Sequence, residues 1–181
     1  KTLGYQTILI DPRKAWGNEN RFPHVDRLIQ AWVDDAFEQI KINSSTAIAV
    51  LTHDPKIDDP AIKLALNSSA FYVGALGSKN TNAKRNERFR SDGVSESQIN
   101  NIHAPIGLDI GAQNPEEIAL AIMSQIVQTF RKQKQPEIKN EAENLQSPVS
   151  NLQSPVSSLQ SPISNSLILQ FSRIFYETRI F

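Results

Sequence analysis

Hydrophobic residues in the first 134 positions follow two alternating patterns, short apolar runs and apolar positions at helical spacing. The runs are rich in Ile, Val and Leu and carry few charges, which is typical of strands that helices cover on both faces. They predict strands at residues 7–10, 46–51 and 70–75, and a short strand near 101–104. Strands that alternate with helices predict an α/β fold with a mostly parallel sheet.

Between the runs, apolar residues recur every three or four positions, as on the buried face of a helix. This spacing predicts helices over residues 25–40 and 119–130, with Trp32, Phe37 and Met123 packed in the core. Three capping signals predict further helix starts: Asp59 before Pro60, Ser95 with Gln98, and Asn114 before Pro115 with Glu117.

The C-terminal part of the chain has a different composition. All 7 Gly lie before residue 112, and three seven-residue units, NLQSPVS, NLQSPVS and SLQSPIS, run from Asn144 to Ser164. The proline in each unit costs a helix about 3 kcal/mol, so the period of seven does not indicate a coiled coil. We predict a folded domain at 1–134, a disordered low-complexity linker at 135–165 and an apolar tail at 166–181.

The apolar tail, SLILQFSRIFYETRIF, has three interpretations. It is a sticky tail, a docking strand or an out-of-place translation product. We favour a tail without catalytic function.

Charge and composition exclude several function classes. Lys plus Arg and Asp plus Glu both number 19, so no overall field attracts nucleic acid or an anionic membrane. With no Cys, the chain has no disulfide, thiolate zinc site, iron–sulfur cluster or cysteine nucleophile, and its 3 dispersed His do not form a zinc pattern. We expect no metal site and no catalytic set. Without a secretory start or a long apolar run, we expect a soluble, cytoplasmic protein.

Ligands of open α/β sheets bind at the carboxyl ends of the strands, so the residues after each predicted strand are candidate site residues. Asp11, after the first strand, can accept hydrogen bonds from a ribose diol, and Arg13 can instead meet a phosphate; the alternative is a simple turn. His53 and Asp54 place an imidazole beside a carboxylate, suited to proton transfer or hydrogen bonding, although an ordinary loop is the default interpretation.

Two glycine-containing loops follow the later strands. Gly74, Gly77, Ser78 and Lys79 lead into a predicted helix, where free amides favour an anion, although the spacing is not that of a P-loop. Basic residues that follow could strengthen this site, dock a partner or form a solvated helix face, which we favour. The second loop carries His103, Gly107 and Asp109, and either closes over a ligand or makes a structural turn.

Four segments together resemble the C-terminal Rossmann-like domain of the XdhC/CoxI family: VLTHD at 50–54, FYVGALGSK at 71–79, IHAPIGLDIGA at 102–112 and PEEIA at 115–119. The resemblance covers about residues 3–132. It implies a three-layer sandwich and an accessory protein, not an enzyme, that binds molybdenum cofactor, supports its sulfuration and hands it to a molybdenum hydroxylase such as xanthine dehydrogenase. A cysteine desulfurase and a second copy of the chain are further candidate partners.

The resemblance also assigns the candidate residues to one crevice. His53 and Asp54, the loop of Gly74, Gly77, Ser78 and Lys79, and His103, Gly107 and Asp109 line it, and Asp11 and Arg13 occupy its ribose-or-pterin side. Molybdopterin carries a phosphate and a polar pterin, which a glycine loop at a helix start can receive.

Two features of the family pattern are missing, an N-terminal segment and a first strand with a glycine-rich turn. We therefore expect an N-terminally truncated domain with a gap at the centre of its sheet, apolar helix faces exposed there, and a need for a partner to fold. Two alternatives stay open. One is an NAD(P)-binding oxidoreductase fragment, against which the missing GxGxxG pattern counts, and the other is a non-functional split or decayed gene product.

Overall fold

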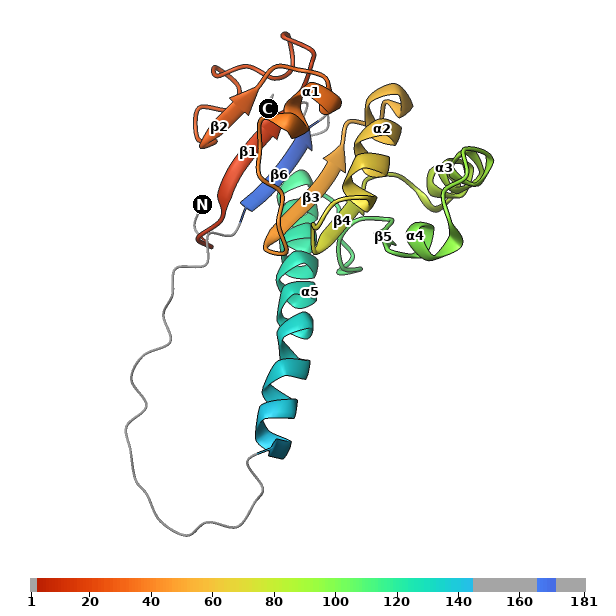
Figure 1. The fold of residues 1–181 in the computed structure, drawn as a ribbon. Helices are drawn as coiled ribbons and strands as arrows, with labels where there is room; N and C mark the ends of the chain where they lie inside the picture. Colours follow the sequence, from red (N-terminus) through yellow and green to blue (C-terminus); the bar gives the residue numbers. More distant parts are fainter. Residues whose placement is uncertain (1–2, 145–165, 172–181) are drawn as a thin grey trace.

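The computed structural model describes residues 3–144 and 166–171, which form one six-stranded sheet with helices on both faces (Figure 1). The strands are β1 (Gln6–Ile10), β2 (Arg27–Ile29), β3 (Thr46–Leu51), β4 (Tyr72–Ala75), β5 (Ile102–His103) and β6 (Ser166–Phe171). The helices are α1 (Val33–Glu38), α2 (Pro55–Leu66), α3 (Lys79–Ser91), α4 (Glu96–Asn100) and α5 (Pro115–Asn144). None of these helices has the length and apolar composition needed to cross a bilayer.

The strand order is β2-β1-β6-β3-β4-β5, and every described strand pair is parallel. One face of the sheet packs against α1, α2, α3 and α4 through a core that includes Val33, Ile62, Phe89 and Ile99. The other face packs against α5, where Ile126 is fully buried. These two cores confirm the predicted three-layer α/β sandwich.

The gap predicted at the centre of the sheet is filled. β6 lies between β1 and β3 and pairs with both, for example through Ile168 with Ile8 and Ile48 (Figure 1). Ile168 is 3% exposed, and burying a side chain of this size stabilises a fold by about 1.5–3 kcal/mol. The expectation of an open gap was therefore wrong, because the docking-strand interpretation holds for residues 166–171.

The strand predictions hold better than the helix predictions. β3 has the bounds predicted from its apolar run, whereas the helix predicted over residues 25–40 is wrong. Its first half contains β2, because Asp26 binds β1: its carboxylate accepts the Thr7 backbone N–H at 2.8 Å, and its own N–H donates to the Thr7 carbonyl at 3.0 Å. Trp32 is 55% exposed at the start of α1 instead of packing in the core.

Two of the three predicted helix starts are confirmed. Ser95 and Gln98 form a capping box at α4, and the Asn114 side chain accepts the Glu117 N–H at 2.8 Å at α5. The start at Asp59 is wrong, because Asp54 caps α2 and Pro55 begins it.

α5 also extends to Asn144, ten residues past the predicted domain end at 134, although Pro136 lies within it. The rest of the predicted linker, 145–165, and the tail beyond 171 lie outside the described residues.

Candidate functional site

The parallel strands bring the ends of β1, β3 and β4 to one edge of the sheet, which we call the carboxyl edge. The Leu76 N–H donates to the Val50 carbonyl at 2.9 Å, which joins the end of β4 to the end of β3. The charges of Asp54 and Asp58 contribute to a raised pKa of Arg13. The end of β1 therefore lies near these two residues, which follow β3. Three of the four predicted loops therefore meet at this edge.

The loop after β1 is held by hydrogen bonds between its own residues. The buried Asp11 carboxylate accepts three hydrogen bonds from Arg13, from its backbone N–H at 2.9 Å and its guanidinium at 2.9 and 2.8 Å. The first cause of the raised Arg13 pKa is this hydrogen bonding to Asp11. A ribose diol or a phosphate would have to displace one of these partners.

The loop after β3 is strained and well anchored. His53 is exposed and has a φ of 62°, a left-handed conformation uncommon for a residue other than glycine. Strain of this kind persists only where neighbours fix the backbone. Those neighbours are Asp54, whose side chain accepts the Lys56 N–H at 3.0 Å, and Thr52, whose hydroxyl accepts the Asp54 N–H at 3.2 Å.

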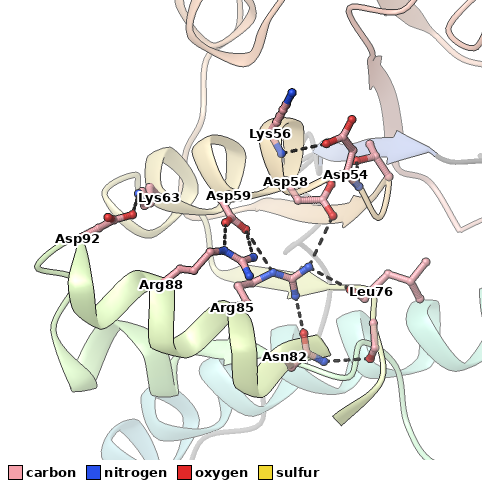
Figure 2. Close-up of polar contacts among 12 residues, drawn as sticks. Asp54, Lys56, Asp58, Asp59, Lys63, Leu76, Asn82, Arg85, Arg88 and Asp92 are labelled. Atoms are coloured by element: carbon pink, nitrogen blue, oxygen red, sulfur yellow. Dashed lines mark hydrogen bonds and ion pairs between the residues drawn. The ribbon is translucent and has the colours of Figure 1, made fainter. Parts of the chain in front are cut away.

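A buried ion pair lies directly beneath this loop (Figure 2). Asp58 of α2 is 0% exposed and Arg85 of α3 is 3% exposed, and their closest oxygen and nitrogen are 3.5 Å apart. The Thr52 hydroxyl donates to the other Asp58 oxygen. Burial raises the pKa of Asp58 and lowers that of Arg85, and in each case the partner's charge opposes the shift. Each charge thus offsets part of the cost of burying the other.

The same network orients the loop between β4 and α3 (Figure 2). Arg85 donates to the Leu76 carbonyl at 3.2 Å, and the Asn82 side-chain amide donates to the Gly77 carbonyl at 2.9 Å. A trans peptide holds its C=O and N–H in opposite directions. Two carbonyls that point into the protein therefore turn the Gly77 and Ser78 N–H groups outward.

Neither of these two N–H groups meets an acceptor among the described residues. They lie at the start of α3, where Ser78 is the N-cap and its hydroxyl accepts the Thr81 N–H at 3.2 Å. A helix start with outward amides attracts anions. Lys79, exposed at the first position of α3, adds a positive charge there.

The two glycines of the β4 segment have different roles. Gly77 has a φ of 140°, and a Cβ there would lie 3.1 Å from Thr81, so the loop conformation requires glycine. Gly74 lies inside β4, within the strand predicted at 70–75, and not in the loop that follows it. A Cβ on Gly74 would lie 2.5 Å from Ile106 and 2.7 Å from the Tyr72 ring, so its role is close packing against the α5 layer.

The loop after β5 returns to the carboxyl edge only in part. The Ile106 N–H donates to the Ala75 carbonyl at 3.1 Å, and the Gly107 N–H donates to Gln125 of α5 at 2.8 Å. Gly107 is thus packed against α5. Asp109 is exposed, and its carboxylate accepts the Gly111 N–H at 3.4 Å.

The structure places His103 away from the carboxyl edge. Its ring stacks on Tyr72, the first residue of β4, with ring centres 4.5 Å apart. His103 also lines a cavity of about 480 Å³ near the amino ends of the strands, together with Ser68, Asn101 and Thr129. Burial lowers the pKa of His103 and raises that of Tyr72, whose hydroxyl donates to Gln125 at 2.6 Å.

The sequence analysis missed the buried polar residues that hold the site. Asn82 and Arg85 lie within the strongly polar α3, whose basic run was interpreted as a solvated face, and Asp58 lies in the charged first part of α2. Arg85 is instead buried, and Arg88 binds Asp59 at 2.7 Å. One signal was present: Asn82, Arg85 and Phe89 are three and four positions apart and share the buried face of α3.

The fold and the site together define a class: a Rossmann-like domain whose carboxyl edge presents two outward N–H groups at the start of a helix. Within the described residues, no group of three or more His, Asp or Glu could hold a metal ion. The family model for the XdhC Rossmann domain matches residues 1–126. The chain belongs to this family. The matched segment contains β1 to β5 and ends within α5, so β6 lies outside it.

Known proteins agree with this assignment. The chain is 32% identical over 129 residues to a Bacillus subtilis protein described as a probable xanthine dehydrogenase subunit, covering 71% of this chain and 37% of that protein. It is 30% identical over 86 residues to the molybdenum cofactor insertion chaperone PaoD of Escherichia coli, covering 48% of this chain and 27% of PaoD.

A solved structure is also similar. A crystal structure described as a xanthine dehydrogenase from Bacillus halodurans shares 29% identity and a TM-score of 0.62, covering 74% of this chain and 38% of that one. The chain thus spans less than two-fifths of the length of these relatives.

Proposed function

We propose that this chain is an accessory protein, not a catalyst, that binds molybdenum cofactor, supports its sulfuration and delivers it to a molybdenum hydroxylase such as xanthine dehydrogenase. The observation that carries the proposal is the pair of outward N–H groups at Gly77 and Ser78, on a domain of the XdhC Rossmann family. The similarity to a molybdenum cofactor insertion chaperone supports the ligand class, and the similarity to a probable component of xanthine dehydrogenase supports the partner class.

The residues at the carboxyl edge fit the organic part of this cargo. The phosphate of molybdopterin suits the two outward amides and the α3 N-terminus. The exposed His53 imidazole and the Asp54 carboxylate offer a donor and an acceptor to a polar pterin. The chain has no Cys that could bind the metal. The cofactor itself would supply the molybdenum chemistry, and these residues would bind and orient its phosphate and pterin.

An NAD(P)-binding oxidoreductase is the competing function, because Asp11 follows a strand at the position where such folds bind a ribose. Its carboxylate already accepts three hydrogen bonds from Arg13, which leaves little capacity for a diol. This occupancy favours the accessory function.

The deciding experiment is anaerobic equilibrium binding of the full chain to molybdenum cofactor and, in parallel, to NADH. The proposal expects micromolar or tighter binding of the molybdenum cofactor and much weaker binding of NADH. Tighter binding of NADH would replace the proposal with the oxidoreductase.

A matched glycine pair assigns the binding to the proposed loop. Gly77 and Gly93 both have positive φ and flank α3, so alanine strains the backbone at either position. A Cβ crowds Thr81 at Gly77 but meets nothing within 4 Å at Gly93. Gly77→Ala should weaken cofactor binding about tenfold, a loss of ~1.4 kcal/mol, while Gly93→Ala leaves it unchanged. Equal affinities in the two variants would remove the loop from the site.

A further inference from the structure

Trp32 is a large apolar side chain whose exposure the fold does not explain. It is the N-cap of α1 and is 55% exposed, and its side chain makes no capping hydrogen bond. Within the described residues, its indole ring contacts no other aromatic ring or cation and is part of neither hydrophobic core. Trp32 therefore does little to stabilise the fold.

The other tryptophan of the chain is already engaged. The guanidinium groups of Arg13 and Arg21 lie 5.9 and 4.8 Å from the centre of the Trp16 ring, within the range of a cation–π interaction. Since the chain has 2 Trp, Trp16 is an internal reference for Trp32.

Trp32 lies at the carboxyl edge. The Asp11 N–H donates to the Ile29 carbonyl at 3.2 Å, which joins the ends of β1 and β2, and Trp32 follows shortly after Ile29. Figure 1 shows α1 at the end of the sheet to which the strand arrows point. The indole is therefore at the same end of the sheet as the outward N–H groups of Gly77 and Ser78.

The start of α1 also reaches across the sheet toward the site. Val33, which follows Trp32 and is 4% exposed, borders a small apolar void together with Ile10 of β1 and Val50 of β3. β4 is the next strand, about 4.8 Å beyond β3. One ligand can therefore reach both the indole and the loop that follows β4.

Two hydrogen bonds hold the backbone on either side of the indole. The Gln30 side chain donates to the Gly17 carbonyl at 2.6 Å, and the Ala36 N–H donates to the Trp32 carbonyl at 2.9 Å. A tryptophan side chain has only two rotatable bonds, so it offers a large flat surface at a low cost in conformational entropy. Such a surface suits one face of a planar ring.

We propose that Trp32 is a binding residue that stacks on the pterin ring of the molybdenum cofactor, an inference that rests on the proposed function. The flat face of the pterin packs on the indole, and its polar edges bind His53 and Asp54, which follow β3. The adenine of NADH has a similar flat face, so the experiment has one arm for each ring.

The two tryptophans give a direct measurement. Nuclear magnetic resonance of the full chain, isotopically labelled at its tryptophan nitrogens, gives one indole N–H signal for each Trp, and Trp16→Phe and Trp32→Phe assign the two signals. Neopterin, a soluble pterin without a phosphate, is added up to millimolar concentration, and adenosine is added to a parallel sample.

The proposal expects a saturable shift of the Trp32 signal with neopterin. The Trp16 signal should shift much less, because Arg13 and Arg21 already contact its ring. An unmoved Trp32 signal, or a shift with adenosine alone, would overturn the proposal.

Affinity for the whole cofactor gives a second measurement. Trp32→Ala should weaken binding of molybdenum cofactor about fivefold or more, the usual loss when an aromatic stacking partner is removed, and Trp32→Phe should keep most of the affinity. Leu3→Ala is the matched control, because Leu3 is 58% exposed and precedes β1 at the amino edge. Equal affinities in the Trp32→Ala and Leu3→Ala variants would also contradict the stacking role.

Failure of the proposed function would give a different result. A neopterin shift at Trp32 without binding of the whole cofactor would remove the outward amides from the site and keep the stacking residue. Cofactor binding that leaves the Trp32 signal unmoved would keep the proposed function and overturn the stacking residue.

Discussion

The two edges of the sheet differ in what they present to a ligand. The carboxyl edge has outward amides at Gly77 and Ser78, held by the buried side chains of Arg85 and Asn82. The amino edge has the cavity of about 480 Å³ beside His103, lined by side chains of several elements. This cavity is therefore at the end of the strands opposite the oriented N–H groups.

This difference shows that volume and orientation are separate properties of a site. Groups that are fixed before binding cost no ordering entropy when a ligand arrives, whereas an open cavity gives space alone. The carboxyl edge is fixed by a buried ion pair, which is costly to maintain and is lost if either member is removed.

The largest expected loss of stability comes from replacing Arg85, which is buried beneath the carboxyl edge. Arg85→Met leaves the buried Asp58 without its cation, which should lower the free energy of unfolding by about 3–5 kcal/mol. Arg88→Met is the matched control, because Arg88 lies one turn along α3, has a 42% exposed side chain and pairs with Asp59. That change should cost about 0.2–1 kcal/mol. Urea unfolding measures both, and similar losses would mean that the buried pair does not hold the carboxyl edge.

The second-largest effect is expected in the loop between β4 and α3, which carries the outward N–H groups. Asn82→Ala removes the donor to the Gly77 carbonyl and an acceptor for Arg85, which frees the peptide to turn. We expect a loss of about 1–3 kcal/mol in stability and about tenfold in affinity for molybdenum cofactor. Asn86→Ala, one turn farther along the same helix, is the control and should leave affinity unchanged. Unchanged affinity in the Asn82 variant would show that the amides are not oriented by this contact.

The carboxyl edge could be predicted in outline because its signals are local. The apolar run of β3, the Ser78 cap and the position of the loops after the strands all follow from neighbouring residues. The role of Arg85 could not be predicted, because its burial depends on Asp58, 27 positions away and on another helix. The spacing of Asn82, Arg85 and Phe89 marks one face of α3, but it does not show that Arg85 is paired with a carboxylate there.

The placement of β6 and of His103 depends on still more distant contacts. The apolar pattern of residues 166–171 indicates a strand, but only the unpaired edges of β1 and β3 determine where it lies. His103 lies within the short strand predicted near 101–104, and in the structure its ring stacks on Tyr72 of the neighbouring strand β4. Pairing between distant strands thus determines the positions of β6 and His103, which the local sequence pattern does not specify.

A third prediction addresses the amino edge. Thr129→Leu places a larger apolar side chain at the wall of the cavity and removes a β-branched residue from α5. Since the cavity is not the proposed site, affinity for molybdenum cofactor should stay the same and stability should rise by a few tenths of a kcal/mol, about the gain in helix propensity. Calorimetric titration and thermal unfolding measure the two quantities. A clear loss of affinity would move the site to the amino edge.

The smallest expected effect is a pH dependence that belongs to the amino edge alone. Burial lowers the pKa of His103 below its ordinary value of 6.5, so the unfolded chain binds this proton more tightly than the folded one. The contribution of neutral His103 to the free energy of unfolding is therefore complete above pH 6.5. It is lost as the pH falls through the lower pKa that His103 has in the folded state. Because the ring is only half-buried, the loss should be a fraction of the ~1.4 kcal/mol that one full unit represents.

His103→Phe keeps an aromatic ring against Tyr72 and removes the titration. Urea unfolding of both proteins above and below pH 6.5 should show a smaller acid-side loss in the variant, with cofactor affinity equal in the two proteins at neutral pH. If the acid-side losses are equal, another group accounts for them. If affinity falls in the variant, His103 contributes to binding, and the separation between the two edges of the sheet is incorrect.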